Sequence, residues 1–396
     1  MRFLLDVTPL RRVPAFRRFW AGSAASALCG QFTVFAATFA VWELTRSTVL
    51  IGALGLVSAV AWFVALPVGM AFIDTVDRAR VARSVILAQC ATVAALAAAA
   101  HLGSVAAILA LVGVNTLLMA IGQPARRAMV PALVGDGLIA PALALYNLSF
   151  QVGLLAGPAL AGLLTSAAGV EVCFLVNLVG FAASLYGLRG LSVDPAGTSR
   201  GFGAMAEGLR FAVRRPPVRG ALLVDLAATV LAMPLALFPA INQERFGGDP
   251  ATLGLFGSAV AVGGVTGMVL SGTVTRRGRP GTVMTACACV WGLALAAAGF
   301  SAHLPPLLAA LAVAGAADTW SVVSRGTLVQ SATPEDMRGR VSSLELAIGI
   351  AGPHLGNFRA GLVAPLLGAG AAMAAGGVMC AAVCAAVYAL TPGMRR

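Results

Sequence analysis

Hydrophobic residues follow one another in long runs along the chain, and short polar segments separate these runs. Each run approaches the length of about 20 residues that a helix needs to cross a bilayer, and none shows the alternation typical of membrane β-barrels. Helices are expected, because in lipid the backbone must satisfy its own hydrogen bonds. The pattern predicts about twelve transmembrane helices, near residues 19–42, 49–73, 84–101, 104–123, 143–168, 171–188, 218–241, 252–275, 282–303, 305–330, 341–366 and 369–391.

Composition supports this interpretation. Of the 396 residues, 59% are hydrophobic and 11% are charged, whereas soluble domains carry roughly 25% charged residues. So few charges cannot cover a soluble surface of this size, and we expect a multi-pass protein surrounded by the lipid bilayer. The net charge of +12 could indicate nucleic-acid binding, but the arginines lie in short clusters between apolar runs. That distribution is typical of membrane topology, so no nucleic-acid partner is expected.

The arginine clusters also predict an orientation. They precede the first span, follow spans 2, 4, 6, 8 and 10, and end the chain, while the alternate loops hold only Arg46 and Arg245. Loops rich in arginine stay on the cytoplasmic side. We therefore expect both termini in the cytoplasm of a bacterial cell and an even number of spans in the inner membrane. The basic N-terminal segment, Met1 to Arg18, is expected to be retained together with the first span.

The longest polar stretch divides the predicted spans six and six. It covers residues 189–217, so the sequence predicts an N-terminal half over 1–188, a cytoplasmic central loop over 189–217 and a C-terminal half over 218–396. Gly157-Pro158-Ala159-Leu160-Ala161-Gly162 in span 5 recurs more loosely as Gly352-Pro353-His354-Leu355-Gly356 in span 11. Two pseudo-symmetric six-helix halves resemble the build of major facilitator transporters, which implies a substrate site between the halves near the middle of the bilayer.

The turn after span 2 resembles the cytoplasmic motif of that superfamily. The resemblance rests on Gly69, Asp74, Asp77, Arg78 and Arg80, although Met70 stands where a glycine is expected and Thr75 replaces the usual arginine. A small residue lets two helices approach, and an aspartate near a helix end can pair with an arginine and hold the inward side shut. The alternative is an ordinary cytoplasmic loop in which the arginines only set the topology.

Span 5 resembles the antiporter motif of the same superfamily, which is typical of exporters. The matching residues are Gly153, Gly157, Pro158 and Gly162, with Ala161 in place of one glycine. Small residues allow close helix crossing, and proline removes one backbone hydrogen bond. Plain packing of small residues is the alternative explanation.

Three further segments resemble the branch of enterobactin exporters and macrolide-efflux proteins. They are Pro124-Ala-Arg-Arg-Ala-Met-Val-Pro131, Gly208-Leu-Arg-Phe211 with Arg215-Pro-Pro217, and Thr333-Pro-Glu-Asp-Met-Arg-Gly-Arg-Val341. These segments come from both halves, and the resemblance covers nearly the whole chain. It implies proton-driven export of bulky, often amphipathic molecules such as siderophores, macrolides or other natural products.

Ionisable residues inside the predicted spans are candidates for proton or charge coupling: Asp318, Asp225, Glu345, Arg325 and Arg359. A charge at the centre of the bilayer costs about 2.5–3.5 kcal/mol on insertion scales, so such residues face a cavity or a partner. Asp318 is the first candidate because its expected depth is greatest. A structural pair between Asp318 and Arg325 or Arg359 is the alternative, and for Asp225 and Glu345, nearer the cytoplasmic edge, a structural role is favoured.

Neutral polar and aromatic residues in the spans are candidates for the wall of a substrate cavity: Gln31, Phe35, Thr38, Asn115, Asn147, Gln151 and Trp320. In the superfamily that the chain resembles, spans 1, 4, 7 and 10 line the central cavity, which favours Gln31 and Asn115. Hydrogen bonds between packed helices explain a single membrane Asn or Gln equally well.

The main hypothesis is a proton-coupled exporter of a small molecule, acting as a monomer. The chain lacks the HExxH, GxSxG and Walker motifs, and its cysteines and histidines are not spaced as metal ligands. We therefore expect a protein that is not an enzyme, with no catalytic residue, metal site or cofactor. A facilitator or importer on the same fold, and a membrane scaffold or sensor that transports nothing, are the alternatives.

Overall fold

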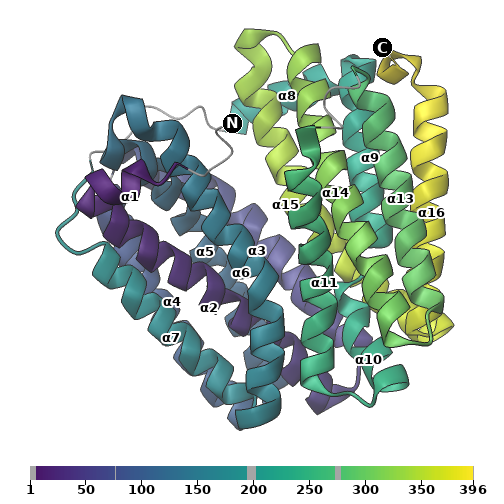
Figure 1. The fold of residues 1–396 in the computed structure, drawn as a ribbon, viewed down its shortest axis with the longest axis horizontal. Coiled ribbons are helices and arrows are strands. Elements are labelled where there is room, and N and C mark those ends of the chain that lie inside the picture. Colours follow the sequence, from purple (N-terminus) through teal and green to yellow (C-terminus); the bar gives the residue numbers. More distant parts are fainter. Residues whose placement is uncertain (1–5, 76, 194–201, 273–277, 396) are drawn as a thin grey trace. The chain divides into compact units, whose positions relative to one another are not determined.

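The structure is a computed structural model that describes residues 6–75, 77–193, 202–272 and 278–395, without the side chains of residues 66–75, 136 and 202–206. The described chain folds into helices joined by short turns (Figure 1). The predicted all-α membrane architecture is confirmed.

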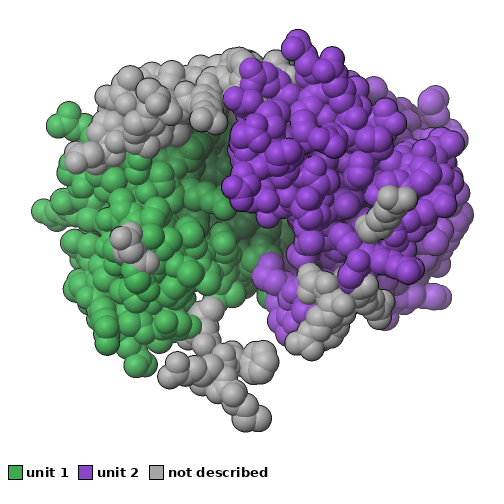
Figure 2. All heavy atoms as spheres, turned by 90° about the horizontal axis from the view of Figure 1, so that it is seen from above, with its two compact units in different colours: residues 1–44, 60–199 green, residues 45–59, 200–396 purple. Residues whose placement is uncertain are grey.

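The chain divides into two compact units, which Figure 2 shows in two colours. Unit 1 comprises residues 1–44 and 60–199, and unit 2 comprises residues 45–59 and 200–396. The first helices are α1 (Thr8–Arg12), α2 (Pro14–Thr45), α3 (Thr48–Thr75), α4 (Arg78–His101), α5 (Val105–Val134), η1 (Asp136–Leu138), α6 (Ile139–Ala168) and α7 (Val170–Gly187). They are followed by α8 (Phe202–Arg214), α9 (Pro216–Ala232), η2 (Leu235–Leu237), α10 (Phe238–Phe246), α11 (Pro250–Val269), α13 (Pro280–Phe300), α14 (Leu304–Ala332), α15 (Glu335–Leu367), α16 (Ala369–Leu390) and η3 (Pro392–Arg395).

Eleven segments of the described chain are long and apolar enough to cross a membrane. The predicted span 341–366 coincides with α15, which has 33 residues but is not among the eleven. Its apolar run is interrupted by His354, Asn357 and Arg359. A helix of 33 residues is about 50 Å long, which is enough to cross the hydrocarbon core of a bilayer. What sets α15 apart from the eleven segments is therefore its polar residues and not its length.

The seventh predicted span is not one helix. The sequence predicts an unbroken helix over 218–241, whereas α9 ends at Ala232 and the chain continues through η2 into α10. Pro234 explains the break, because proline has no backbone N–H and disfavours a helical conformation in the residue before it. The backbone N–H of Ala236 donates to Asn357 Oδ1 over 3.2 Å, so α15 satisfies a donor that the break frees.

The helices with the Gly-Pro motifs make similar crossings in the two units. In unit 1, a Cβ on Gly153 of α6 would lie 2.9 Å from the carbonyl oxygen of Ala27 in α2. In unit 2, a Cβ on Gly356 of α15 would overlap the carbonyl oxygen of Thr229 in α9. Each motif helix ends at a glycine with positive φ, Gly169 at 87° and Gly368 at 84°, a conformation that favours glycine.

The predicted central loop contains a helix. Within 189–217, α8 spans Phe202–Arg214 and packs against α15. Glu207 forms an ion pair of 2.8 Å with Arg340 of α15, and a Cβ on Gly208 would lie 2.6 Å from the carbonyl oxygen of Arg340. The helix is amphipathic, since Gly208 and Ala212 are buried while Arg210 and Arg214 are exposed.

Candidate functional site

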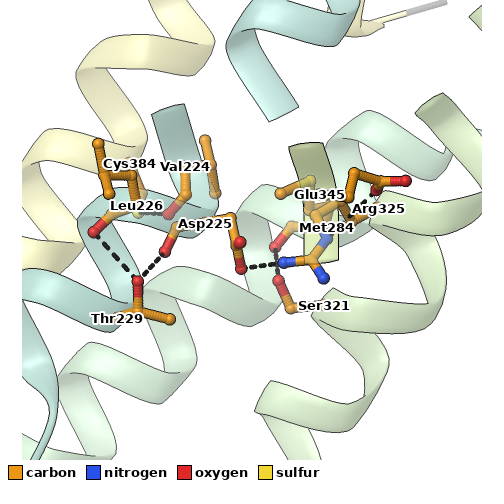
Figure 3. A network of polar contacts seen from close by, with 9 residues as sticks. All are labelled: Val224, Asp225, Leu226, Thr229, Met284, Ser321, Arg325, Glu345 and Cys384. Atoms are coloured by element: carbon orange, nitrogen blue, oxygen red, sulfur yellow. Dashed lines mark hydrogen bonds and ion pairs between the residues drawn. The ribbon is translucent and has the colours of Figure 1, made fainter. Parts of the chain in front are cut away.

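A cluster of charged side chains lies in the helix bundle of unit 2 (Figure 3). Arg325 of α14 pairs through Nη1 with Asp225 Oδ1 of α9, and its Nε lies 3.5 Å from Glu345 Oε1 of α15. The three side chains are 12%, 9% and 13% exposed, respectively. The cluster forms because α9 packs against both α14 and α15, so each of the three helices contributes one charge.

Backbone contacts around the cluster fix the helices that carry it. Cys384 of α16 donates its thiol to the carbonyl oxygen of Val224, next to Asp225, over 3.8 Å, and Ser321 of α14 donates to Met284 O of α13 over 3.2 Å (Figure 3). Two atoms of the cluster, Asp225 Oδ2 and Arg325 Nε, are buried without a hydrogen-bond partner among the described residues, although Nε lies 3.5 Å from Glu345 Oε1. A buried polar atom of this kind normally has a partner, so the missing hydrogen bond at Asp225 Oδ2 is unfavourable while the carboxylate is ionised.

Asp318 belongs to the same region but not to the ion pairs. It lies on α14 within electrostatic range of Asp225 and Arg325, is exposed, and makes no ion pair or hydrogen bond with the described residues. The alternative of a structural Asp318–Arg325 pair is wrong in this structure. Seven residues correspond to about 10 Å along a helix axis, and carboxylates of the neighbouring helices lie closer to the guanidinium.

Arg359 has a different environment from Arg325. Its Nη2 donates to the carbonyl oxygen of Leu231 over 2.6 Å, in the last turn of α9, and its Nε is buried without a hydrogen-bond partner among the described residues. The last carbonyls of a helix lack partners within the helix, and a cation near them is favourable. Arg359 and Asn357 of α15 thus flank the break between α9 and α10 and satisfy its backbone. Arg359 therefore does not form the structural pair with Asp318 that the sequence offered as an alternative.

The neutral candidates fall into two groups. Four of them already have partners within the protein. Thr38 donates to Val34 O over 2.9 Å, and Asn115 accepts from Gln89 over 3.4 Å. Trp320 donates to Gly267 O over 2.7 Å, and the Phe35 ring stacks on Phe39 at 6.1 Å between centroids. The others, Gln31, Asn147 and Gln151, have no hydrogen-bond partner among the described residues. These three side chains lie on α2 and α6, and their role in a substrate cavity stays a prediction.

In the motif after span 2, Asp77 is the carboxylate whose side chain the structure describes, whereas Gly69 and Asp74 are described only as positions in α3. Asp77 caps α4, accepting from Ala79 N at 2.7 Å and Arg80 N at 3.3 Å, and it also accepts from Ser192 Oγ at 2.8 Å. Burial acts to raise the pKa of Asp77, but these hydrogen bonds, with one from Val193 N, hold the pKa below its ordinary value. The expectation that an aspartate of this motif pairs with an arginine and holds the inward side shut stays a prediction.

Two features near these motifs were missed by sequence reasoning. The start of α4 is tied to the segment after α7, because Arg78 N donates to Val193 O over 3.1 Å and Arg83 Nη2 donates to Leu191 O over 2.7 Å. In addition, Arg126 of α5 lies within electrostatic range of Tyr146 in α6. The first contact had no signal in the sequence, while Arg126 was visible only as part of a resembling segment.

Membrane-length helices, glycine-lined crossings and a buried cluster of opposite charges in the bundle define a polytopic transporter. The chain belongs to the major facilitator family described as transmembrane secretion effectors, whose sequence pattern matches residues 6–394. The resemblance seen in the sequence is confirmed, and the protein belongs to a transporter family rather than to a family of enzymes.

Relatives that match the chain include two kinds of efflux protein. It is 28% identical over 365 residues to the enterobactin exporter EntS of Salmonella typhimurium, which covers 89% of this chain and 86% of the exporter. It is also 28% identical over 277 residues to the multidrug efflux pump Tap of Mycolicibacterium fortuitum, which covers 67% of each chain.

Solved structures show the same fold at lower identity. A bacterial homologue of the iron transporter ferroportin in an inward-facing state superposes with a TM-score of 0.75 at 16% identity, over 96% of this chain and 98% of the other. The nucleoside transporter NupG gives a TM-score of 0.74 at 14% identity, over 96% and 98%. These likenesses show a shared fold and nothing about the molecule that is carried.

Proposed function

We propose that this transporter exports a small organic molecule across the bacterial inner membrane in exchange for protons. The relatives named EntS and Tap are an enterobactin exporter and a multidrug efflux pump, which favours an amphipathic cargo such as a siderophore, a macrolide or another natural product. The protein works as a monomer with both termini in the cytoplasm, and the span 5 motif supports export over import.

One observation supports the coupling to protons more than any other. Three carboxylates, Asp225, Asp318 and Glu345, lie around a single arginine, Arg325. If all three were ionised, the group would carry a net charge of −2, and an excess charge among membrane helices is unfavourable. Binding a proton removes part of that excess. The group therefore has a physical reason to exchange protons when its surroundings change.

Within this group Asp318 is the residue best placed to exchange the proton. Asp225 and Glu345 are held at Arg325 with little exposure, whereas Asp318 is exposed and unpaired among the described residues. An alternating transporter presents such a carboxylate to different surroundings in its two states. A proton bound in one state and released in the other links the proton gradient to movement of the cargo.

The test is transport into everted membrane vesicles, with radiolabelled enterobactin and the dye ethidium as separate probes. We expect the Asp318→Asn variant to lose accumulation driven by the proton gradient, while exchange of probe across the membrane without a gradient is retained. Glu335→Gln is the matched control, because its side chain is 90% exposed and it also removes one carboxylate. The control variant should accumulate both probes as the wild type does.

The outcomes separate the alternatives. If Asp318→Asn still accumulates a probe against its gradient, the proton role of Asp318 is wrong. Wild-type flux that is only downhill and independent of pH would indicate a facilitator. Uptake in the opposite direction would indicate an importer, and the absence of flux for every probe tested would favour a scaffold or sensor.

A further inference from the structure

A cavity of about 290 Å³ lies in unit 1 between one end of α2 and one end of α7. It is lined by Arg17, Arg18, Ala21, Gly22, Ala183 and Tyr186. The two helices approach closely beneath it: a Cβ on Gly22 would lie 2.9 Å from Ser184 Cα, and one on Gly187 would lie 2.7 Å from Arg18 O. The lining thus combines small residues at a tight helix crossing with the long side chains of Arg17, Arg18 and Tyr186.

The charge of this cavity is uncompensated. Arg17 and Arg18 are exposed, and neither guanidinium has an ion-pair or hydrogen-bond partner among the described residues. Tyr186 is 61% exposed. Two guanidinium groups without partners among the described residues, beside Ala21, Gly22 and Ala183, favour an anion that also has an apolar part.

The position of the cavity narrows the choice of ligand. Arg17 and Arg18 lie in the first turns of α2, and Tyr186 lies in the last turn of α7, so the cavity is at the level where both spans leave the hydrocarbon. Tyrosine and arginine are favoured at this level, where phospholipid headgroups lie. The volume is at the lower limit of cavities that enclose drug-sized ligands. It suits a headgroup whose acyl chains continue along the helices, and the cargo of an exporter would be expected nearer the middle of the bilayer.

We propose that this cavity is a binding site for an anionic phospholipid. Arg17 and Arg18 bind the phosphodiester, the ring of Tyr186 packs against the glycerol region, and Ala21, Gly22 and Ala183 leave room for the start of an acyl chain. The site is separate from the charged cluster of unit 2 and does not depend on the direction of transport or on proton coupling.

The experiment measures lipid binding to the full-length protein in detergent by native mass spectrometry. Phosphatidylglycerol, phosphatidylcholine and soluble glycerol 3-phosphate are titrated separately. Because arginines near a headgroup attract an anionic lipid, the wild type should bind phosphatidylglycerol on the order of tenfold or more tightly than phosphatidylcholine. Glycerol 3-phosphate should bind too weakly to measure, because it lacks acyl chains.

Matched variants separate the cavity from general surface charge. Arg17→Gln with Arg18→Gln should abolish the preference for phosphatidylglycerol. Arg11→Gln with Arg12→Gln removes the same charge from exposed residues of α1 that do not line the cavity, and it should keep the preference within about twofold, because only arginines near the headgroup contribute. Ala21→Trp leaves the charge unchanged and fills the cavity, so it should reduce binding as well.

Three results would overturn the proposal. The first is an equal loss in the Arg17/Arg18 and Arg11/Arg12 variants, which would indicate only nonspecific surface attraction. The second is unchanged binding in Ala21→Trp, which would place the lipid elsewhere. The third is binding of glycerol 3-phosphate as tight as that of phosphatidylglycerol, which would indicate a soluble phosphate ligand. If the Arg17/Arg18 variant does not elute as a folded monodisperse protein, Ala21→Trp decides alone.

Discussion

Arg325 joins three helices of unit 2, because from α14 it contacts Asp225 of α9 and Glu345 of α15. Removing one partner of a buried ion pair costs about 3–5 kcal/mol, since the remaining charge is left without compensation. Here the loss of the arginine would leave two carboxylates of low exposure facing each other. Its contribution to stability should therefore exceed that of arginines near the ends of the helices.

We expect Arg325→Gln to lower the midpoint of thermal unfolding in detergent markedly, corresponding to roughly 3–5 kcal/mol of lost stability. Arg338→Gln is the control, because Arg338 pairs with Glu335 at 3.6 Å while the two side chains are 50% and 90% exposed. An exposed pair contributes about 0–1 kcal/mol, so this variant should unfold close to the wild type.

A second variant tests whether charge is the cause. Adding Asp225→Asn to Arg325→Gln removes one of the stranded carboxylates, so the double variant should recover part of the lost midpoint. If the double variant is less stable than Arg325→Gln alone, the arginine acts through packing and the electrostatic explanation is wrong.

At the residue scale, the sequence singled out charged side chains that the structure places in one region, but it did not predict which of them form pairs. Asp225, Asp318, Arg325 and Glu345 were all singled out because an ionisable group in an apolar run is unusual. The pairs could not be predicted, because positions along α14 relate Asp318 only to Arg325. Which carboxylates reach Arg325 depends on how α9 and α15 pack against α14, and no spacing in the sequence contains that information.

At the scale of helices, α15 depends on glycine where it crosses α9. A Cβ on Gly356 would overlap the carbonyl oxygen of Thr229 and lie 2.8 Å from Met233 Cβ, whereas a Cβ on Gly339 of the same helix would meet nothing within 4 Å. Alanine substitutions at these two glycines can therefore distinguish the effect of close helix packing from the intrinsic preference of alanine for a helix.

We expect substitutions at these two glycines to have opposite signs. Gly356→Ala should destabilise the protein by about 1–3 kcal/mol, because the added methyl group forces α15 away from α9. Gly339→Ala should be neutral or stabilising by up to about 1 kcal/mol, since alanine is the better helix former. Thermal unfolding in detergent measures both, and an equal effect of the two substitutions would show that the crossing at Gly356 is not tight.

Some helix boundaries in the structure differ from the ends of the apolar runs in the sequence. The pattern ends span 4 at residue 123, yet α5 continues to Val134 with Pro124 and Pro131 inside it. It also joins α9 to α10, which the structure separates at Pro234. Hydropathy reports where the chain is apolar, whereas a helix can continue past the apolar run, as α5 does, and can end inside one, as α9 does before Pro234.

At the scale of the whole molecule, the fold was largely predictable because lipid permits so few solutions. Runs of about 20 apolar residues must be helical, and the motifs in 69–80, 153–162 and 333–341 pointed to the family that matches residues 6–394. The cavity at Arg17 and Arg18 was not predictable, because it arises from the approach of α2 and α7, which are separated by more than 100 residues of sequence. The same arginines served in the sequence only as evidence for topology.

Topology is the remaining property of the whole chain that the sequence predicts and that an experiment can settle directly. Alkaline phosphatase is active only when it is exported from the cytoplasm, so fused to the end of the chain it should be inactive, because arginine-rich loops stay on the cytoplasmic side. The control is a fusion after Ser301, between α13 and α14, at the end of the ninth predicted span, and it should be highly active. Equal, high activity of both fusions would overturn the cytoplasmic C-terminus and with it the even number of spans. Inactivity of both, with each fusion protein detected in the membrane, would instead show that the spans before Ser301 are miscounted.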